Sequence, residues 1–114
     1  MDVPDEFYDF ASEHKGSVKV DLTGAREILA ETKRRRLFIQ SIEGWRIDDD
    51  GYWHSDLSIS KMGLSGEDEY LTLGQHYAFD EKLFEHAQSL QYDCIFEVWL
   101  GDELSLRTKR QELK

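Results

Sequence analysis

Hydrophobic residues recur at helical spacing in three stretches of the chain. We expect helices over residues 5–15, 23–36 and 80–90, because their apolar side chains fall three and four positions apart. Gly16 is suited to end the first helix. Residues suited to begin the helices precede or open them: Pro4 for the first, Thr23 or Gly24 for the second and Asp80 for the third.

Five other stretches are rich in β-branched and aromatic residues and are bounded by turn-forming residues. The expected strands are residues 17–22, 37–47, 52–62, 69–79 and 92–100. The last of them, YDCIFEVWL, is apolar on both faces and is expected at the centre of the sheet. The final stretch, LSLRTKRQELK, fits a strand in its first half or a frayed helix, and its last six residues stay unassigned.

This order of elements predicts an α+β fold. We expect an antiparallel meander sheet of about four to six strands, with two or three helices packed mainly on one face. No linker or internal repeat divides the chain, so residues 1–114 are predicted to form a single globular domain.

The stretch GWRIDDDGYWHSD places three aspartates and a glycine between two expected strands. An EF-hand calcium loop with Gly51 at its sixth position would have Arg46 and Leu57 at its ends, where oxygen ligands are needed. A three-residue hairpin loop explains the run better, since glycine closes it in a left-handed conformation without strain. A calcium site of another type is the less favoured alternative. The expected cross-strand pairs are Ile47–Trp53, Trp45–Ser55, Glu43–Leu57 and Ser41–Ile59.

This register divides the side chains of the hairpin between two faces of the sheet, and a two-residue loop would scatter the apolar ones over both. The face expected toward the core carries Ile39, Trp45, Ile47, Trp53, Leu57 and Ile59. The opposite face carries Phe38, Ile42, Arg46, Tyr52, His54 and Asp56. Its aromatic and charged composition is typical of a binding surface. The alternative is that a helix covers part of it.

Charge is unevenly distributed along the chain. The formal net charge is −10, and residues 37–106 contain 15 acids against three bases. Such a field attracts basic partners and repels nucleic acid, although solubility alone is a simpler interpretation. The basic run KRRR at 33–36 fits the negative end of a helix dipole, with a phosphate-binding patch or a partner contact as alternatives.

Two features predict a protein of the cytoplasm. The N-terminus is acidic, and no apolar run approaches the roughly 18 residues that a membrane span needs, so we expect no membrane association. The single cysteine, Cys94, excludes an internal disulfide and fits a reducing compartment. Its place in the run CIFEVWL favours a buried structural thiol over a reactive one.

Residues that could support catalysis are few. His54 and Asp56 lie two apart on an expected strand, so they could orient each other or ligate a metal, although a structural role is favoured. Glu67, Asp68 and Glu69 fit a solvated turn. The chain contains no glycine-rich phosphate loop, nucleophile elbow, paired cysteines or helical His-Glu-x-x-His. We therefore predict no enzyme activity, no cofactor and no metal.

The helix AREILAETKRRR leading into LFIQSIEGW, and a later helix followed by CIFEVWL, resemble the order of elements in tRNase-colicin immunity proteins. The chain as a whole resembles bacterial immunity proteins of the colicin or contact-dependent inhibition type, and the similarity in order covers about half of it. The resemblance implies an acidic inhibitor that occupies the basic substrate cleft of a toxin nuclease domain without binding nucleic acid itself.

The residues expected to contact this partner share acidic, aromatic or hydrogen-bonding side chains. They are Arg46, Asp48, Asp49, Asp50, Tyr52, His54, Asp56, Glu67, Asp68 and Glu69. One alternative function is a phage or host acidic adaptor that mimics nucleic acid and inhibits a DNA-binding protein. A less favoured alternative is a small metal-assisted hydrolase using His54 and Asp56.

Overall fold

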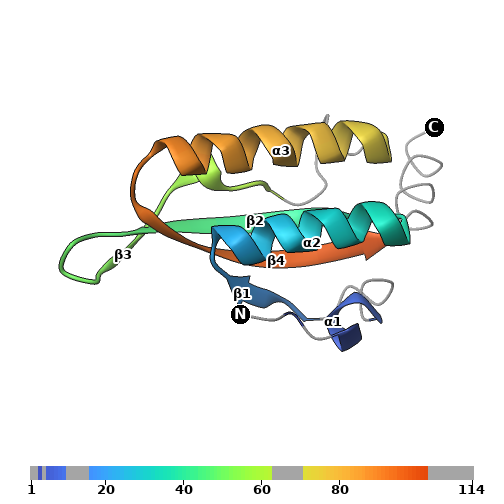
Figure 1. The fold of residues 1–114 in the computed structure, drawn as a ribbon, viewed down its shortest axis with the longest axis horizontal. Coiled ribbons are helices and arrows are strands. Elements are labelled where there is room, and N and C mark those ends of the chain that lie inside the picture. The colour runs from blue at the N-terminus through green and yellow to red at the C-terminus, as the bar shows by residue number, and fades with distance from the viewer. Residues whose placement is uncertain (1–2, 4, 10–15, 63–70, 103–114) are drawn as a thin grey trace.

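The computed structural model describes residues 3, 5–9, 16–62 and 71–102, and these form an α+β fold as predicted (Figure 1). The helices are α1 (Asp5–Asp9), α2 (Leu22–Arg35), the 3₁₀ helix η2 (Leu57–Ile59) and α3 (Leu73–Ser89). The strands are β1 (Val18–Val20), β2 (Leu37–Ile47), β3 (Trp53–Ser55) and β4 (Asp93–Asp102). The GEDEY stretch and the stretch 104–114 lie outside the described residues.

The four strands form one antiparallel sheet in the order β1-β4-β2-β3. β4 lies between β1 and β2, so the prediction of a central strand from its two apolar faces is confirmed. The longest ladder joins β2 to β4, from the pair Leu37–Asp102 to the pair Ile47–Asp93. Among the described strands only β2 and β3 are neighbours both in the sheet and in sequence, so the sheet is antiparallel as predicted but is not the predicted meander.

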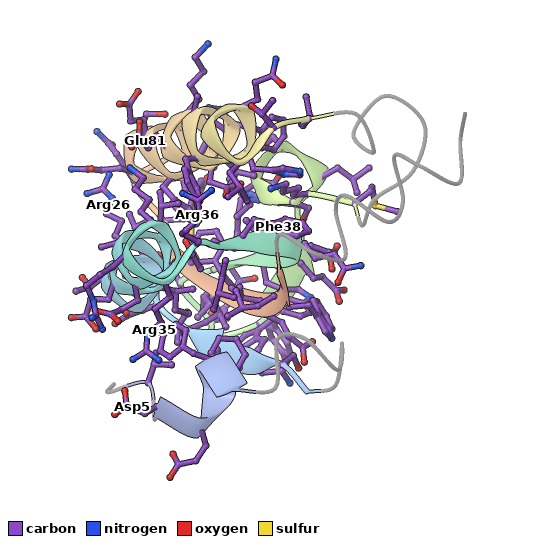
Figure 2. The ribbon with its side chains drawn as sticks, turned by 90° about the vertical axis from the view of Figure 1, so that its right-hand side faces the viewer. Asp5, Arg26, Arg35, Arg36, Phe38 and Glu81 are labelled. Carbon is purple, nitrogen blue, oxygen red and sulfur yellow. The ribbon has the colours of Figure 1, made fainter. Side chains whose placement is uncertain are left out.

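α2 and α3 lie side by side on one face of the sheet and run in opposite directions (Figure 1). Figure 2, turned by 90°, shows both helices on the same side of the strands. Between these layers lies the core, in which the rings of Phe84 and Phe96 meet edge to face with their centroids 5.6 Å apart. The even-numbered residues of β4 supply this core: Cys94, Phe96, Val98 and Leu100.

The predicted facing of β2 is wrong beyond Ile39. The pairing with β4 shifts by one residue between Ile39 and Ser41, and an extra residue in a strand turns every later side chain to the other face. Ile42, expected at the surface, is therefore buried in the core, whereas Trp45 is partly exposed on the opposite face. Phe38 is also fully buried, with its ring centroid 4.7 Å from that of His76 on α3, so helix cover, the alternative for this face, holds for Phe38.

The predicted strand over residues 69–79 is wrong, because its described part opens α3. Thr72 caps this helix: its Oγ1 accepts from the Gln75 N–H, and the Gln75 side chain accepts from the Thr72 N–H. Asp80, expected as the cap, lies inside α3 and is fully buried. α2 likewise begins earlier than predicted, at Leu22, and its N-cap is Asp21, whose carboxylate accepts from the Gly24 N–H at 2.8 Å.

The hairpin register is confirmed near its loop and wrong farther along. Ile47 pairs with Trp53 and Trp45 with Ser55, and Gly51 has the left-handed φ of 86°. After Ser55 the chain forms η2 in place of the predicted strand, so the expected pairs Glu43–Leu57 and Ser41–Ile59 do not form. The approach of η2 to β2 depends on Gly44, since a Cβ there would lie 2.3 Å from the Ile59 carbonyl oxygen.

Candidate functional site

The β2–β3 hairpin extends beyond the ends of both long helices (Figure 1). Asp49, Asp50 and Gly51 are exposed at its end. Next to them, Tyr52 retains 70% of its accessible surface and Trp53 49%. Two large aromatic rings thus project beside two carboxylates, and exposed aromatic rings of this kind anchor protein interfaces whose rims are polar. We call residues 48–54 the hairpin tip.

Asp48 holds the hairpin tip in shape. Its Oδ1 accepts from the Asp50 and Tyr52 N–H groups at 3.0 and 2.9 Å, and its Oδ2 lies 2.7 Å from His54 Nε2. The hydrogen bond with His54, followed by that from the Tyr52 N–H, lowers the pKa of the Asp48 carboxyl below its ordinary value. Asp48 is therefore used inside the loop, which leaves Asp49 and Asp50 to face outward.

Asp56 also makes its contacts within the chain. Its Oδ1 accepts from the Ser58 N–H and Oγ–H, which lowers the pKa of its carboxyl, and its Oδ2 lies 3.1 Å from Arg46 Nε. The Arg46 guanidinium stacks over the Tyr92 ring, 5.3 Å from its centroid. Thus, of the predicted pair His54 and Asp56, the first bonds to Asp48 and the second caps η2 and anchors Arg46.

A serine and a histidine come together beside this cap. His86 Nε2 on α3 lies 3.1 Å from Ser58 Oγ, while the Ser58 hydroxyl donates to Asp56 at 2.7 Å. A nucleophilic serine must give its proton to the histidine, but here the proton points to a carboxylate. This arrangement suits a His86 that donates to Ser58, and it joins α3 to η2.

A second exposed surface lies on the sheet face that points away from α2 and α3. We call it the outer face, and it consists of Lys19, Ser41, Glu43, Trp45, Ile47, Trp53, Ser55, Ile95, Glu97 and Trp99. Trp45 and Trp53 pack with their rings 5.8 Å apart, and Lys19 Nζ lies 6.0 Å from the Trp45 ring centroid. This surface was not predicted from the sequence. Its signal was that Ile95, Glu97 and Trp99 in CIFEVWL alternate with the core residues and therefore share one face of the strand.

The basic run at the end of α2 is neutralised by neighbouring acids. Arg34 and Arg35 both bond to Glu31, and these hydrogen bonds lower the pKa of the Glu31 carboxyl to about 2. Arg35 also pairs with Asp5 of α1 at 3.1 Å. The position of the run in the last turn matches its predicted dipole role, and these cations are already used in ion pairs.

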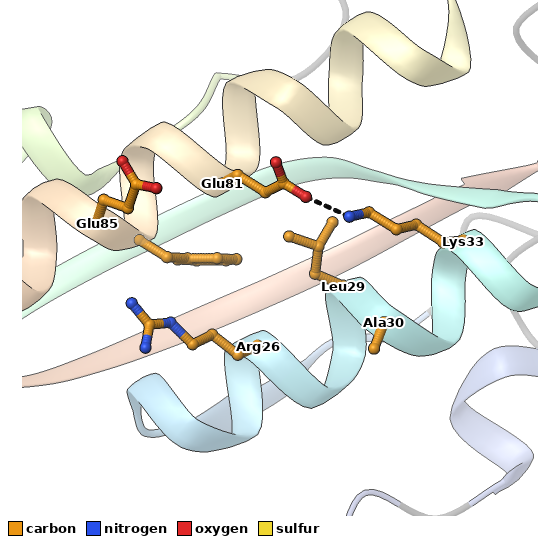
Figure 3. A pocket seen from close by; sticks show the side chains of 7 residues that line it. Arg26, Leu29, Ala30, Lys33, Glu81 and Glu85 are labelled. Carbon is orange, nitrogen blue, oxygen red and sulfur yellow. Dashed lines mark hydrogen bonds and ion pairs between the residues drawn. The ribbon is translucent and has the colours of Figure 1, made fainter.

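A groove of about 450 Å³ runs between α2 and α3 (Figure 3). Lys33 pairs with Glu81 across it, and Arg26 donates to the Gln88 side-chain oxygen at 2.6 Å. Its apolar lining comes from Leu29, Ala30 and Phe84. The Lys33–Glu81 ion pair and the Arg26–Gln88 hydrogen bond both join α2 to α3, so the groove lies along the contact between the two helices.

Cys94 is buried, and burial raises the pKa of its thiol, which makes the thiolate scarcer. Among the described residues, no three His, Cys, Asp or Glu side chains gather as a metal ion would need. Glu67, Asp68 and Glu69 lie outside the described residues. No helix in the described ranges is long and apolar enough to cross a membrane.

The fold and these surfaces define a small acidic α+β domain with an aromatic hairpin. Comparison of the sequence with protein-family models and with curated proteins gives no match.

Proposed function

We propose that this protein is an acidic protein-binding inhibitor. Its partner is a basic protein, in the first instance a toxin nuclease domain whose substrate cleft it covers, as the resemblance to immunity proteins implies. The observation that carries the proposal is the hairpin tip, where Asp49 and Asp50 stand beside the exposed rings of Tyr52 and Trp53. Such rings bury large areas at interfaces, and the carboxylates occupy positions that phosphates of the substrate would take.

Charge and shape have separate roles in this mechanism. The net charge of −10 speeds the encounter with a basic cleft, since opposite fields raise association rates at low salt. The aromatic rings slow dissociation once they are buried. The hydrogen bonds of Asp48 fix the loop before binding, so little conformational entropy is lost in the complex.

The protein acts by binding and not by catalysis in this proposal. The Ser58 hydroxyl donates to Asp56, an arrangement that opposes its activation by His86. His54 and Asp56, the candidate pair for a metal-assisted hydrolase, each bond to a different neighbour.

The test uses the nuclease domain encoded beside the gene for this protein. The two are co-expressed to score cell survival, and the affinity of the purified proteins is measured by calorimetry at 50 and 300 mM salt. We expect inhibition of the nuclease, and a Kd that rises with salt because the encounter is electrostatic. No binding, or binding without inhibition, would reject the proposal for that pair.

Variants then locate the contact. The double variant Tyr52→Ala, Trp53→Ala should raise the Kd by at least about tenfold, because the loss of even one interface anchor has an effect of this size. Asp49→Asn with Asp50→Asn should mainly lower the association rate. Glu27→Gln with Glu85→Gln removes the same charge from the helix layer and is the matched control, expected to lower the association rate less and to leave the dissociation rate unchanged.

A further inference from the structure

The outer face is hollowed where it meets η2. The hollow measures about 370 Å³, at the small end of the range for ligand pockets. Trp99 and Ser41, which pair across β4 and β2, are among its lining residues. Leu57 and Met62 also line it, with 81% and 72% of their accessible surface exposed. Two exposed apolar side chains and an indole ring thus line the same hollow.

One uncompensated negative charge borders this hollow. Glu43 is exposed and makes no ion pair within the described ranges, and its cross-strand neighbour on β4 is a second carboxylate, Glu97. Like charges directly opposite each other destabilise a sheet. Lys19 on β1 lies across from Glu97, and a further cation beside Glu43 would relieve the remaining repulsion. Glu97 accepts from the Ser17 hydroxyl at 2.7 Å. The ammonium of Lys61, which also lines the hollow, points inward and bonds to Asp80.

The hollow continues the surface of the hairpin. Trp53 and Trp45 lie on the same outer face, and Ser55 belongs both to β3 and to the lining of the hollow. A partner on the hairpin tip can therefore reach the hollow along one face. A second copy of this chain is a poor occupant, because each copy has a net charge of −10.

We propose that this hollow receives an arginine side chain of the basic partner, with the guanidinium between Glu43 and the face of Trp99 and the aliphatic stem against Leu57 and Met62. Arginine matches the site because its planar group stacks on aromatic rings and bonds carboxylates in a fork. This inference rests on the proposed function, since it specifies which group of the basic partner is recognised.

The test needs no partner protein. The full chain, labelled with ¹⁵N, is titrated with N-acetyl-arginine methylamide and, separately, with the citrulline analogue, which has the same shape without the charge. We expect the arginine compound to shift the Trp99 indole N–H and the Glu43 amide resonances. The citrulline compound at equal concentration should bind about threefold more weakly or worse. Equal binding of the two compounds, or shifts confined to other faces, would overturn the inference.

Charge-matched variants complete the experiment. Glu43→Gln should weaken arginine binding by about threefold or more, whereas Glu85→Gln, which removes the same charge from α3, should leave it unchanged. Unaltered spectra elsewhere in Glu43→Gln would show that it is folded. A dimer in sedimentation whose formation shifts the Trp99 indole resonance would also reject the inference. If the arginine compound does not bind, the tip variants can still weaken nuclease binding. The two experiments therefore test the two proposals separately.

Discussion

Lys61 Nζ lies 2.9 Å from Asp80 Oδ1 in the interior of the protein, where the two side chains retain 3% and 0% of their accessible surface. Lys61 follows η2 and Asp80 lies on α3, so the pair joins the end of the hairpin segment to the helix layer. The same ammonium donates to the Ile39 carbonyl oxygen at 2.7 Å. Buried charges are costly unless paired in this way.

Removing one partner of this pair should be strongly destabilising. Lys61→Met leaves a buried carboxylate without its cation, and we expect a loss of about 3 kcal/mol in the free energy of unfolding, measured in urea. Adding Asp80→Leu should cost less than the sum of the two single changes by about 2 kcal/mol, because the second change removes the stranded charge. Strict additivity of the two changes would contradict this account.

The pair also predicts a pH dependence. Burial raises the pKa of the Asp80 carboxyl to about 6, against an ordinary value near 4. The folded state then binds more protons than the unfolded state between about pH 4 and 6, so stability from this group falls as pH rises through that range, by about 2–3 kcal/mol. Asp80→Asn cannot titrate, so subtracting its pH profile from that of the wild type should isolate the fall. A flat or rising difference would be the contrary result.

Gly44 tests the contact between β2 and η2. Gly44→Ala places a methyl group against the Ile59 backbone, and we expect a loss of about 2 kcal/mol or more with displacement of η2. Gly74→Ala is the control. It lies in the first turn of α3, where an added Cβ makes only an ordinary contact, so the change should be neutral or stabilise by up to about 1 kcal/mol. Thermal unfolding of the two variants should separate them clearly.

Asp48 and Asp49 of the hairpin should differ in their effect on folding. Asp48→Ala removes the acceptor of two loop N–H groups and the His54 contact, and should destabilise by about 1 kcal/mol. Asp49→Ala should change stability by less than about 0.5 kcal/mol, because Asp49 is exposed at the tip. Amide hydrogen exchange at Tyr52 should accelerate only in the first variant, and equal rates in both would contradict the role of Asp48.

Gly51 tests the backbone of the loop itself. Nothing lies within 4 Å of an added Cβ there, but φ is 86°, so the cost of Gly51→Val is one of backbone strain alone. We expect about 1 kcal/mol or more, since β-branched residues tolerate positive φ poorly. Asp49→Asn, at an exposed position of the same loop, should have the same melting temperature as the wild type. A Gly51→Val protein that did the same would refute the loop conformation.

Much of the candidate site could be predicted because its determinants are local. A glycine after two aspartates between β-rich stretches fixes the hairpin loop, and that loop places Asp49, Asp50 and Tyr52 at an exposed end. The outer face could not be predicted in the same way. Its position depends on the shift in pairing between Ile39 and Ser41, which depends on the partner strand β4, 50 residues or more away in sequence.

The sequence by itself determined the α+β class, the helix at 22–35, the central strand and the turn at Gly51, because helical spacing, apolar runs and glycine act over a few residues. Only the tertiary structure decided that residues 73–79 are helical. Two buried positions in the first half of α3 are polar, His76 and Asp80, and they hid the helical spacing of the apolar residues. Asp80 can be buried because Lys61 pairs with it. The capping pattern of Thr72 and Gln75 was the one local signal for this helix.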